Sequence, residues 1–192
     1  LIMSKKQKKT NEDEKEEPIK KFKAVFSKER ILADKSDEAV DLYNKSRYGE
    51  YVEDKIQYSF VESLHLLERK RLVLKDIKNK TVKIDSFRKI CEKTEKNFWI
   101  RYCVFRDLRQ RGYIVKTALK FGADFRVYDK GVKPGDDHAK WVVYPLHETD
   151  NLTLYEFSAK NRVAHSTRKT LLLAVVDDEG DVSYWNSSWV KP

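Results

Sequence analysis

Cysteine is scarce in this sequence, and long apolar runs are missing. The two cysteines, Cys91 and Cys103, stand twelve residues apart in a segment expected to form one helix, where this spacing turns their side chains to different faces. Neither a disulfide framework nor a thiolate metal site is therefore supported. No apolar stretch approaches the roughly 20 residues that cross a bilayer, and the N-terminus carries lysines and glutamates where a signal peptide needs an apolar segment. We expect a cytoplasmic protein with no membrane partner.

Acidic residues are fewer than basic residues in this sequence. Lysine and arginine number 40 against 31 acids, which gives a formal net charge of +9. This excess favours a polyanionic partner. A chain in which 37% of residues are charged also forms a solvated surface rich in salt bridges without any such partner, so charge leaves both interpretations open. The 192 residues suffice for one ordinary domain or two small ones.

The N-terminal half divides into a charged tail and a small mixed region. Residues 1–21 alternate lysines with acids and offer little to bury, so we expect a disordered tail. Residues 22–85 are expected to form an N-terminal α+β domain. Its predicted elements are a strand at Phe22–Phe26, a helix at Ser59–Lys70 and a strand at Arg71–Leu74. The helix is indicated by apolar residues at helical spacing and by a capping box of Ser59 and Glu62.

The C-terminal region, residues 86–192, carries the stronger patterns. Residues 86–111 are expected to form one long helix because one face is largely apolar, and Gly112 marks its end. The apolar period then changes to that of strands, with one helix between the third and the fourth strand. The predicted elements are strands at Tyr113–Val115, Asp124–Tyr128, Trp141–Tyr144, Leu171–Val176 and Val182–Trp185, and a helix at Tyr155–Ser166. This order predicts an α/β or α+β domain with a mixed sheet.

Reactive side chains gather at three places on loops or strand ends. A strand ending at Tyr128 runs into a Gly/Pro loop that delivers His138 just before the next strand, and Lys169 stands at the mouth of the apolar strand that follows the last helix. The third place is a basic run of Arg106, Arg109, Arg111, Lys116 and Lys120. Tyrosine, histidine and lysine together suit RNA cleavage without a metal, because the reaction needs a base, an acid and a cation. Tyrosines on such strands are mostly packing residues, so spacing alone leaves that interpretation open.

Four blocks in this order closely resemble the archaeal tRNA-splicing endonuclease family: Asp107–Lys116, Lys120–Tyr128, Arg162–Lys169 and Val175–Trp185. The N-terminal half is similar to the family more loosely, through Arg47-Tyr48-Gly49 and the helix that follows. The resemblance implies a small N-terminal domain and a C-terminal nuclease domain with a mixed central sheet flanked by helices. It also implies cleavage of precursor tRNA at a bulge-helix-bulge, which leaves a 2′,3′-cyclic phosphate and a 5′-hydroxyl and needs no metal or other cofactor.

The roles of three residues follow from the same resemblance. Tyr128 would be the general base, His138 the general acid and Lys169 the cation that stabilises the transition state. The family usually has a serine or similar small residue after the histidine, and Ala139 fills that place here. Tyr128 can serve as a base only if nearby cations such as Lys169 lower its pKa, so positioning of the 2′-hydroxyl is a second possible role.

Substrate binding and assembly are also implied by the resemblance. Arg162 matches an arginine that holds an extruded bulge base, while the second arginine of some relatives has no match, which leaves Trp185 as a stacking candidate or an interface aromatic. The acidic turn around Asp177, Asp178 and Asp181 would repel RNA and is expected to dock into a basic pocket of another protomer. The resemblance thus implies a homotetramer built as a dimer of dimers.

Three alternative functions remain at this point. The chain could be a non-catalytic structural subunit of a heteromeric splicing endonuclease, or an RNA-binding module without chemistry. It could also be a metal-dependent nuclease that uses Asp129, Asp136 and Asp137, although their spacing matches no recognisable metal-ligand pattern. Among the other histidines, His165 competes for the catalytic role and is interpreted as structural, and His65 and His147 have no reactive neighbours in the sequence.

Overall fold

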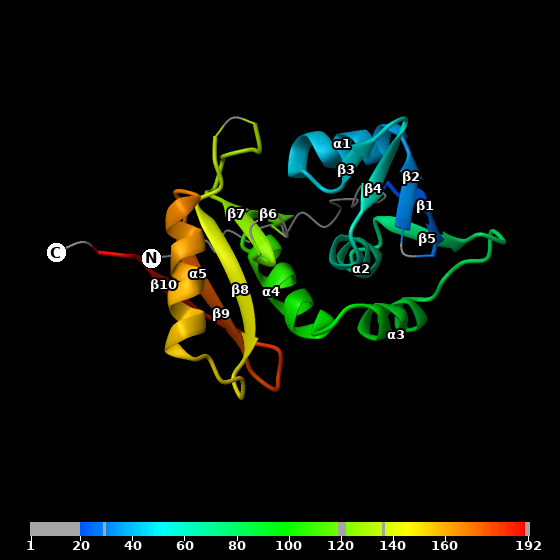
Figure 1. The fold of residues 1–192 in the computed structure, drawn as a ribbon. Coiled ribbons are helices and arrows are strands. Elements are labelled where there is room, and N and C mark those ends of the chain that lie inside the picture. Colours follow the sequence, from blue (N-terminus) through cyan, green and yellow to red (C-terminus); the bar gives the residue numbers. More distant parts are fainter. Residues whose placement is uncertain (1–19, 29, 119–121, 136, 191–192) are drawn as a thin grey trace, which may run out of the picture.

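The computed structural model describes residues 20–28, 30–118, 122–135 and 137–190. Two five-stranded sheets organise this part of the chain, with strand orders β3-β4-β2-β1-β5 and β10-β9-β8-β7-β6 (Figure 1). Each sheet is mixed, because β1 pairs with β5 and β8 pairs with β9 in parallel while the remaining neighbours are antiparallel. The expected small N-terminal domain and mixed C-terminal sheet are therefore confirmed. Within the described ranges, no helix has the length and apolar character needed to cross a membrane.

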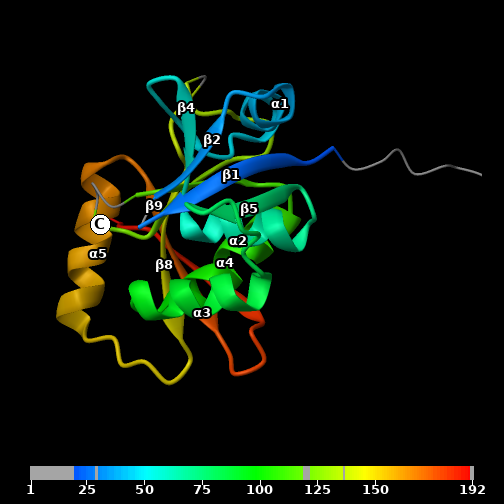
Figure 2. The same ribbon diagram turned by 90° about the vertical axis from the view of Figure 1, so that its right-hand side faces the viewer.

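The N-terminal sheet forms around two short helices. Its elements are β1 (Phe22–Ser27), β2 (Arg30–Asp34), α1 (Asp37–Ser46), β3 (Glu50–Val52), β4 (Lys55–Tyr58), α2 (Phe60–Glu68) and β5 (Leu72–Asp76). The Ser59 hydroxyl accepts from the backbone of Glu62, whose carboxylate accepts from the Ser59 backbone, so the predicted capping box is confirmed. Nearly every side chain of α2 is buried, because this helix lies between the N-terminal sheet and the helices that follow (Figure 2).

The prediction of one helix over residues 86–111 is wrong. The segment forms α3 (Ile84–Thr94) and α4 (Phe98–Gln110), separated by Glu95 in an extended conformation and Asn97 in the left-handed region at φ 56°. Asparagine tolerates this conformation better than most residues. The break lets α3 and α4 each pack against α2 in its own direction. Cys91 and Cys103 consequently belong to two helices rather than one, and both are free and fully buried.

The C-terminal sheet lies between two helices. Its elements are β6 (Ile114–Thr117), β7 (Phe125–Tyr128), β8 (Trp141–His147), α5 (Leu154–Ser166), β9 (Thr170–Val176) and β10 (Val182–Ser187). Alternate residues serve the two faces: Val143 and Leu172 pack on the α4 side, whereas Val142 and Leu171 pack with residues of α5 (Figure 1). The predicted strands, the α5 helix and the hairpin between β9 and β10 are confirmed, with ends shifted by a few residues.

Two buried cations join the N-terminal and C-terminal parts. The Arg109 guanidinium donates to the Ser46 carbonyl at 2.7 Å and to the Val115 carbonyl at 3.1 Å, and the Lys116 ammonium donates to the Gly49 carbonyl at 2.6 Å. Both side chains are less than 9% exposed. The basic run expected from the sequence as a reactive group is thus divided: two of its members hold the fold together, and Lys120 lies outside the described residues.

Candidate active site

The candidate site lies at one edge of the C-terminal sheet, where three strands begin or end. The Lys140 backbone N–H donates to the Val127 carbonyl at 2.9 Å, and the Thr170 N–H donates to the Lys140 carbonyl at 2.9 Å. These two bonds extend the pairing of β7, β8 and β9, so that Tyr128, Lys140 and Lys169 lie next to one another across the three strands. Tyr128 and Lys169 therefore lie at the same edge of the sheet, separated by the β8 strand between them.

The end of α5 determines where Lys169 lies. Its backbone N–H donates to the Ala164 carbonyl at 2.8 Å, while the N–H of Arg168 donates to the His165 carbonyl at 3.0 Å. This pair of bonds is a Schellman motif, with Arg168 in the left-handed region at φ 56°. The motif reverses the chain from α5 directly into β9. The Lys169 ammonium donates to the Thr167 carbonyl at 2.8 Å.

Burial and neighbouring charges shift the pKa values of Tyr128 and Lys169. Burial raises the pKa of Tyr128, and Glu50 adds to that effect, whereas the positive charge of Arg126 opposes it. Burial lowers the pKa of Lys169, and the charge of Arg126 lowers it further. The sequence had suggested Lys169 as the cation that acts on the tyrosine. The cation identified beside Tyr128 is instead Arg126, which had not been singled out.

His138 approaches the same edge on the loop between β7 and β8. Its side chain is exposed, and its backbone N–H donates to the Asp137 carboxylate at 2.6 Å. Between described residues, no hydrogen bond joins its ring to Tyr128 or Lys169. It stands three residues before the first residue of β8, and in Figure 1 this loop rises at the end of the sheet where α5 ends. Asp129 from the same loop is held by Lys140 at 2.6 Å, and Asp136 lies outside the described residues.

The residues expected to bind substrate do not meet in one cavity. Arg162 is exposed on α5 and lines a cavity of about 430 Å³ together with His165 and Trp189. The Trp189 ring stands edge-on to His165, with centroids 4.3 Å apart. Trp185 is 65% exposed on β10 and does not line this cavity. Trp189 was not singled out in the sequence, where nothing distinguished it from Trp185.

The other histidines occupy different environments. His65 is 2% exposed and lies between the rings of Tyr48 and Phe105. His147 donates or accepts through Nδ1 at 2.8 Å from the Thr149 hydroxyl, and its Nε2 lies 3.1 Å from the Asp178 carboxylate. His65 packs within the core, and His147 contacts the acidic turn.

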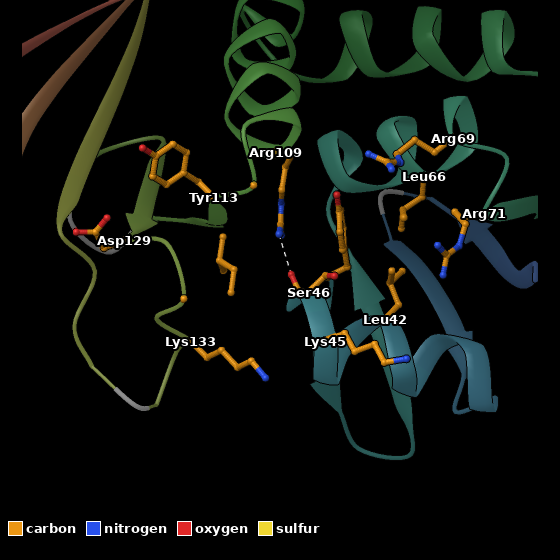
Figure 3. A pocket seen from close by; sticks show the side chains of 14 residues that line it. Leu42, Lys45, Ser46, Leu66, Arg69, Arg71, Arg109, Tyr113, Asp129 and Lys133 are labelled. Atoms are coloured by element: carbon orange, nitrogen blue, oxygen red, sulfur yellow. Dashed lines mark hydrogen bonds between the residues drawn. The ribbon is translucent and has the colours of Figure 1, made fainter. Parts of the chain in front are cut away.

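The acidic turn and a basic cavity lie at different ends of the molecule. Asp177 stabilises the turn, because its carboxylate accepts the Asp181 backbone N–H at 2.8 Å, whereas the Asp178 side chain is 85% exposed. A cavity of about 310 Å³ opens between the N-terminal and C-terminal parts (Figure 3). One acid and five cations line it: Asp129, and Lys45, Arg69, Arg71, Arg109 and Lys133.

The fold defines a class of protein: a mixed α/β protein in which a smaller N-terminal sheet domain precedes a C-terminal sheet domain that carries the candidate site. Comparison with known proteins identifies the family. The model of the tRNA intron endonuclease catalytic C-terminal domain matches residues 98–184, and that of the tRNA intron endonuclease N-terminal domain matches residues 22–88. This chain belongs to the tRNA intron endonuclease family, and it carries the catalytic domain of that family of enzymes.

Individual relatives agree with the family models. A tRNA-splicing endonuclease of Pyrococcus horikoshii is 38% identical over 172 residues, which cover 90% of this chain and 98% of the relative. One of Methanothermobacter thermautotrophicus is 41% identical over 79% of this chain and 87% of the relative. One of Nanoarchaeum equitans is 44% identical over 73% of this chain and 93% of the relative. The similarity therefore includes both sheets and nearly the full length of these relatives.

Proposed function

We propose that this chain cuts precursor tRNA at bulge-helix-bulge splice sites and needs no metal or other cofactor for the reaction. The observation that carries the proposal is that Tyr128 and Lys169 share one sheet edge within the segment matched by the catalytic-domain model. The names of the relatives support tRNA as the substrate class. The positive net charge of +9 suits an RNA partner.

In the proposed reaction the substrate supplies its own nucleophile. The Tyr128 phenolate takes the proton of the 2′-hydroxyl, whose oxygen then attacks the neighbouring phosphorus. The bond from phosphorus to the 5′-oxygen breaks, and the His138 imidazolium gives its proton to that oxygen. The Lys169 ammonium stabilises the charge that grows on the phosphoryl oxygens. The products are a 2′,3′-cyclic phosphate and a 5′-hydroxyl.

The raised pKa of Tyr128 limits its role as a general base in this reaction. Because burial raises the pKa of Tyr128 above its ordinary value near 10, only a small fraction is phenolate at neutral pH. A buried tyrosine is well suited to holding the 2′-hydroxyl in line for attack, so the proposal gives Tyr128 both tasks. His138 is the histidine that the β7–β8 loop brings to this end of the sheet, and an imidazolium can give a proton to the leaving oxygen.

A single-turnover assay on a bulge-helix-bulge RNA tests the proposal. We expect cleavage in excess EDTA, with cyclic phosphate and 5′-hydroxyl ends. His138→Ala should slow cleavage about 100-fold or more while RNA binding stays close to wild type, because general acid catalysis contributes roughly 10² to 10⁴ in rate. His147→Ala is the matched control, since His147 contacts the acidic turn far from the sheet edge.

Each alternative predicts a different result in this assay. Cleavage that stops in EDTA and leaves a 3′-hydroxyl would support a metal-dependent reaction using Asp129, Asp136 and Asp137. Binding without cleavage would support an RNA-binding module or a structural subunit of a heteromeric enzyme. A wild-type rate in His138→Ala would remove His138 from the mechanism.

We infer that Arg162 binds the bulge, with an aromatic side chain nearby. A guanidinium can stack on an unstacked base and bond phosphate at once. Arg162→Ala should weaken binding of the bulged RNA about tenfold or more, because stacking contributes roughly 1–3 kcal/mol per base. Trp185→Leu tests the aromatic candidate singled out in the sequence, and Trp189→Leu tests the one that shares a cavity with Arg162. A fully paired RNA, whose binding should not change, is the control substrate.

We further propose a homotetramer, a dimer of dimers, in which the acidic turn of one protomer enters the basic cavity of another. Three observations support this assembly: the exposed carboxylates of Asp178 and Asp181, the five cations around the cavity, and the separation of turn and cavity within one chain (Figures 1 and 3). Among described residues, Arg69, Arg71 and Lys133 form no salt bridge within the protomer, so their charges are available to a partner.

A further inference from the structure

Arg126 is a cation on the face of the sheet that carries the candidate site. It stands two residues before Tyr128 on β7, so both side chains leave the strand on the same face. Arg126 pairs with Val142, and Val142 pairs with Leu171, which stands two residues after Lys169. Register and alternation thus bring Arg126, Tyr128 and Lys169 to one face, across strands whose outer members are about 10 Å apart.

No protein group within the described residues neutralises this arginine. Its Nε atom is buried and has no hydrogen-bond partner there, and the guanidinium takes part in no salt bridge in the same part of the chain. A buried donor without an acceptor is costly, and a cation that is partly removed from water normally has an acidic partner. The Nε of Arg109 also lacks a partner, but the terminal nitrogens of that guanidinium donate to two backbone carbonyls, and no described residue accepts from the guanidinium of Arg126 in this way.

The charges around Arg126 make an anionic ligand the natural partner. Burial raises the pKa of Tyr128 and lowers that of Lys169, and the positive charge of Arg126 opposes the first effect and adds to the second, so this charge acts on both groups. The acid that acts on Tyr128 is Glu50, whose carboxylate lies 2.9 Å from the Lys116 ammonium. Glu50 is therefore already paired.

We propose that Arg126 is a fourth functional residue of the cleavage site, which binds the phosphate beside Lys169 and favours the phenolate of Tyr128. This inference rests on the proposed function. A guanidinium offers several donors in a fixed plane, so it can hold two phosphate oxygens while the Lys169 ammonium acts as a point charge. The geometry gives Arg126 an advantage over the exposed Arg168, which precedes Lys169 but lies in the helix-terminating turn.

Two measurements test the role of Arg126. In single-turnover cleavage at saturating enzyme, Arg126→Gln should be roughly 100-fold slower than wild type, the usual loss when one preorganised donor is removed. Arg126→Lys keeps the positive charge but loses the paired donors of the guanidinium, so its cleavage rate should lie between those of wild type and Arg126→Gln. Arg30→Gln removes the same charge from an exposed position on β2 in the other sheet and should leave the rate within about twofold.

The second measurement does not depend on activity. Titration of ¹³Cζ-labelled tyrosine by NMR, with the resonance assigned through Tyr128→Phe, should give a higher pKa of Tyr128 in Arg126→Gln than in wild type or Arg126→Lys. This titration reports the charge of Arg126 at the tyrosine, and the cleavage rate reports its contact with the phosphate. Should Arg126→Gln fail to fold by circular dichroism, Arg126→Lys decides through its cleavage rate alone.

The outcomes separate this inference from the proposed function. Wild-type protein that does not cleave the RNA would refute the proposed function, whereas the titration of Tyr128 would still report on Arg126. If wild-type protein cleaves the RNA and Arg126→Gln cleaves it at the same rate, the phosphate contact is overturned. If the Arg126→Gln variant does not fold, a full wild-type rate in Arg126→Lys overturns it instead. An unchanged Tyr128 titration in Arg126→Gln would overturn the electrostatic part.

Discussion

At the scale of single residues, burial decides which titratable groups serve the fold. His65 is the clearest case, because it is 2% exposed and its Nε2 atom has no hydrogen-bond partner among the described residues. Burial, and then the charges of Arg69, Arg109 and Arg106, lower the pKa of His65 from 6.5 to about 4. The imidazole therefore stays neutral in the folded protein where an unfolded chain would protonate it.

This difference predicts a loss of stability in mild acid. Below pH 6.5 the unfolded chain binds a proton at His65 that the folded chain does not bind until about pH 4, so the stability falls across that window. Between pH 7 and pH 5 the contribution is about 2 kcal/mol. Urea unfolding at both pH values should show that His65→Phe loses about this much of the pH dependence.

A matched variant separates this effect from other titrations. His165 is exposed on α5, so His165→Gln should keep the pH dependence of the wild type. Equal pH dependence in His65→Phe and wild type would mean that the buried imidazole takes up its proton in the folded state as well.

At the scale of helices and strands, several helix ends depend on residues in the left-handed region. α2 ends in a Schellman motif, in which the backbone N–H of Lys70 donates to the Leu67 carbonyl at 3.0 Å and the backbone N–H of Arg71 donates to the Leu66 carbonyl at 2.9 Å. Lys70 has φ 56° and an exposed side chain. A residue with a Cβ atom is strained there, whereas glycine is not.

Lys70→Gly should therefore stabilise the protein by roughly 0.5 kcal/mol, the relief of strain less the added entropy of the unfolded chain. The control variant should change the free energy of unfolding in the opposite direction. Lys89 is exposed in the middle of α3, and Lys89→Gly should cost about 1 kcal/mol because glycine is unfavourable inside a helix. Calorimetry of both variants decides the matter, and destabilisation by Lys70→Gly would contradict the strain argument.

Sequence patterns predicted the elements with strong local signals and missed four elements of the N-terminal part: α1, β2, β3 and β4. The α2 capping box and the β9 strand were found because their signals are local and strongly apolar. Helix α1 buries only Ala39 and Leu42, and all three residues of β3 are exposed, so neither produces a clear period. The break between α3 and α4 was missed because apolar residues continue on both sides of Asn97.

The candidate site was predictable only in part for a related reason. Tyr128, His138 and Lys169 were singled out from residue chemistry and from resemblance. Arg126 was not, because its relation to Tyr128 and Lys169 depends on which strands are neighbours and in which register they pair. Such long-range pairing is not encoded in any local pattern. The structural use of Arg109 and Lys116 was hidden from the sequence for the same reason.

At the scale of the whole molecule, charge is distributed unevenly between two distant features. The acidic turn lies at one end of the C-terminal sheet, and the basic cavity lies beside α1 at the other (Figure 1). Reversal of the two exposed carboxylates, Asp178→Lys with Asp181→Lys, should break a tetramer into dimers. Asp177 is left unchanged because its carboxylate stabilises the turn.

A charge swap makes the prediction specific to the cavity. Arg69→Glu with Arg71→Glu should also give dimers, since the turn would then meet like charge. A chain that carries all four changes restores opposite charges in every protomer and should recover the tetramer. Light scattering distinguishes four copies of the 22.8 kDa chain from two. Tetramers in the first variant would rule out the turn as a docking element, and dimers in the combined variant would rule out this cavity as its acceptor.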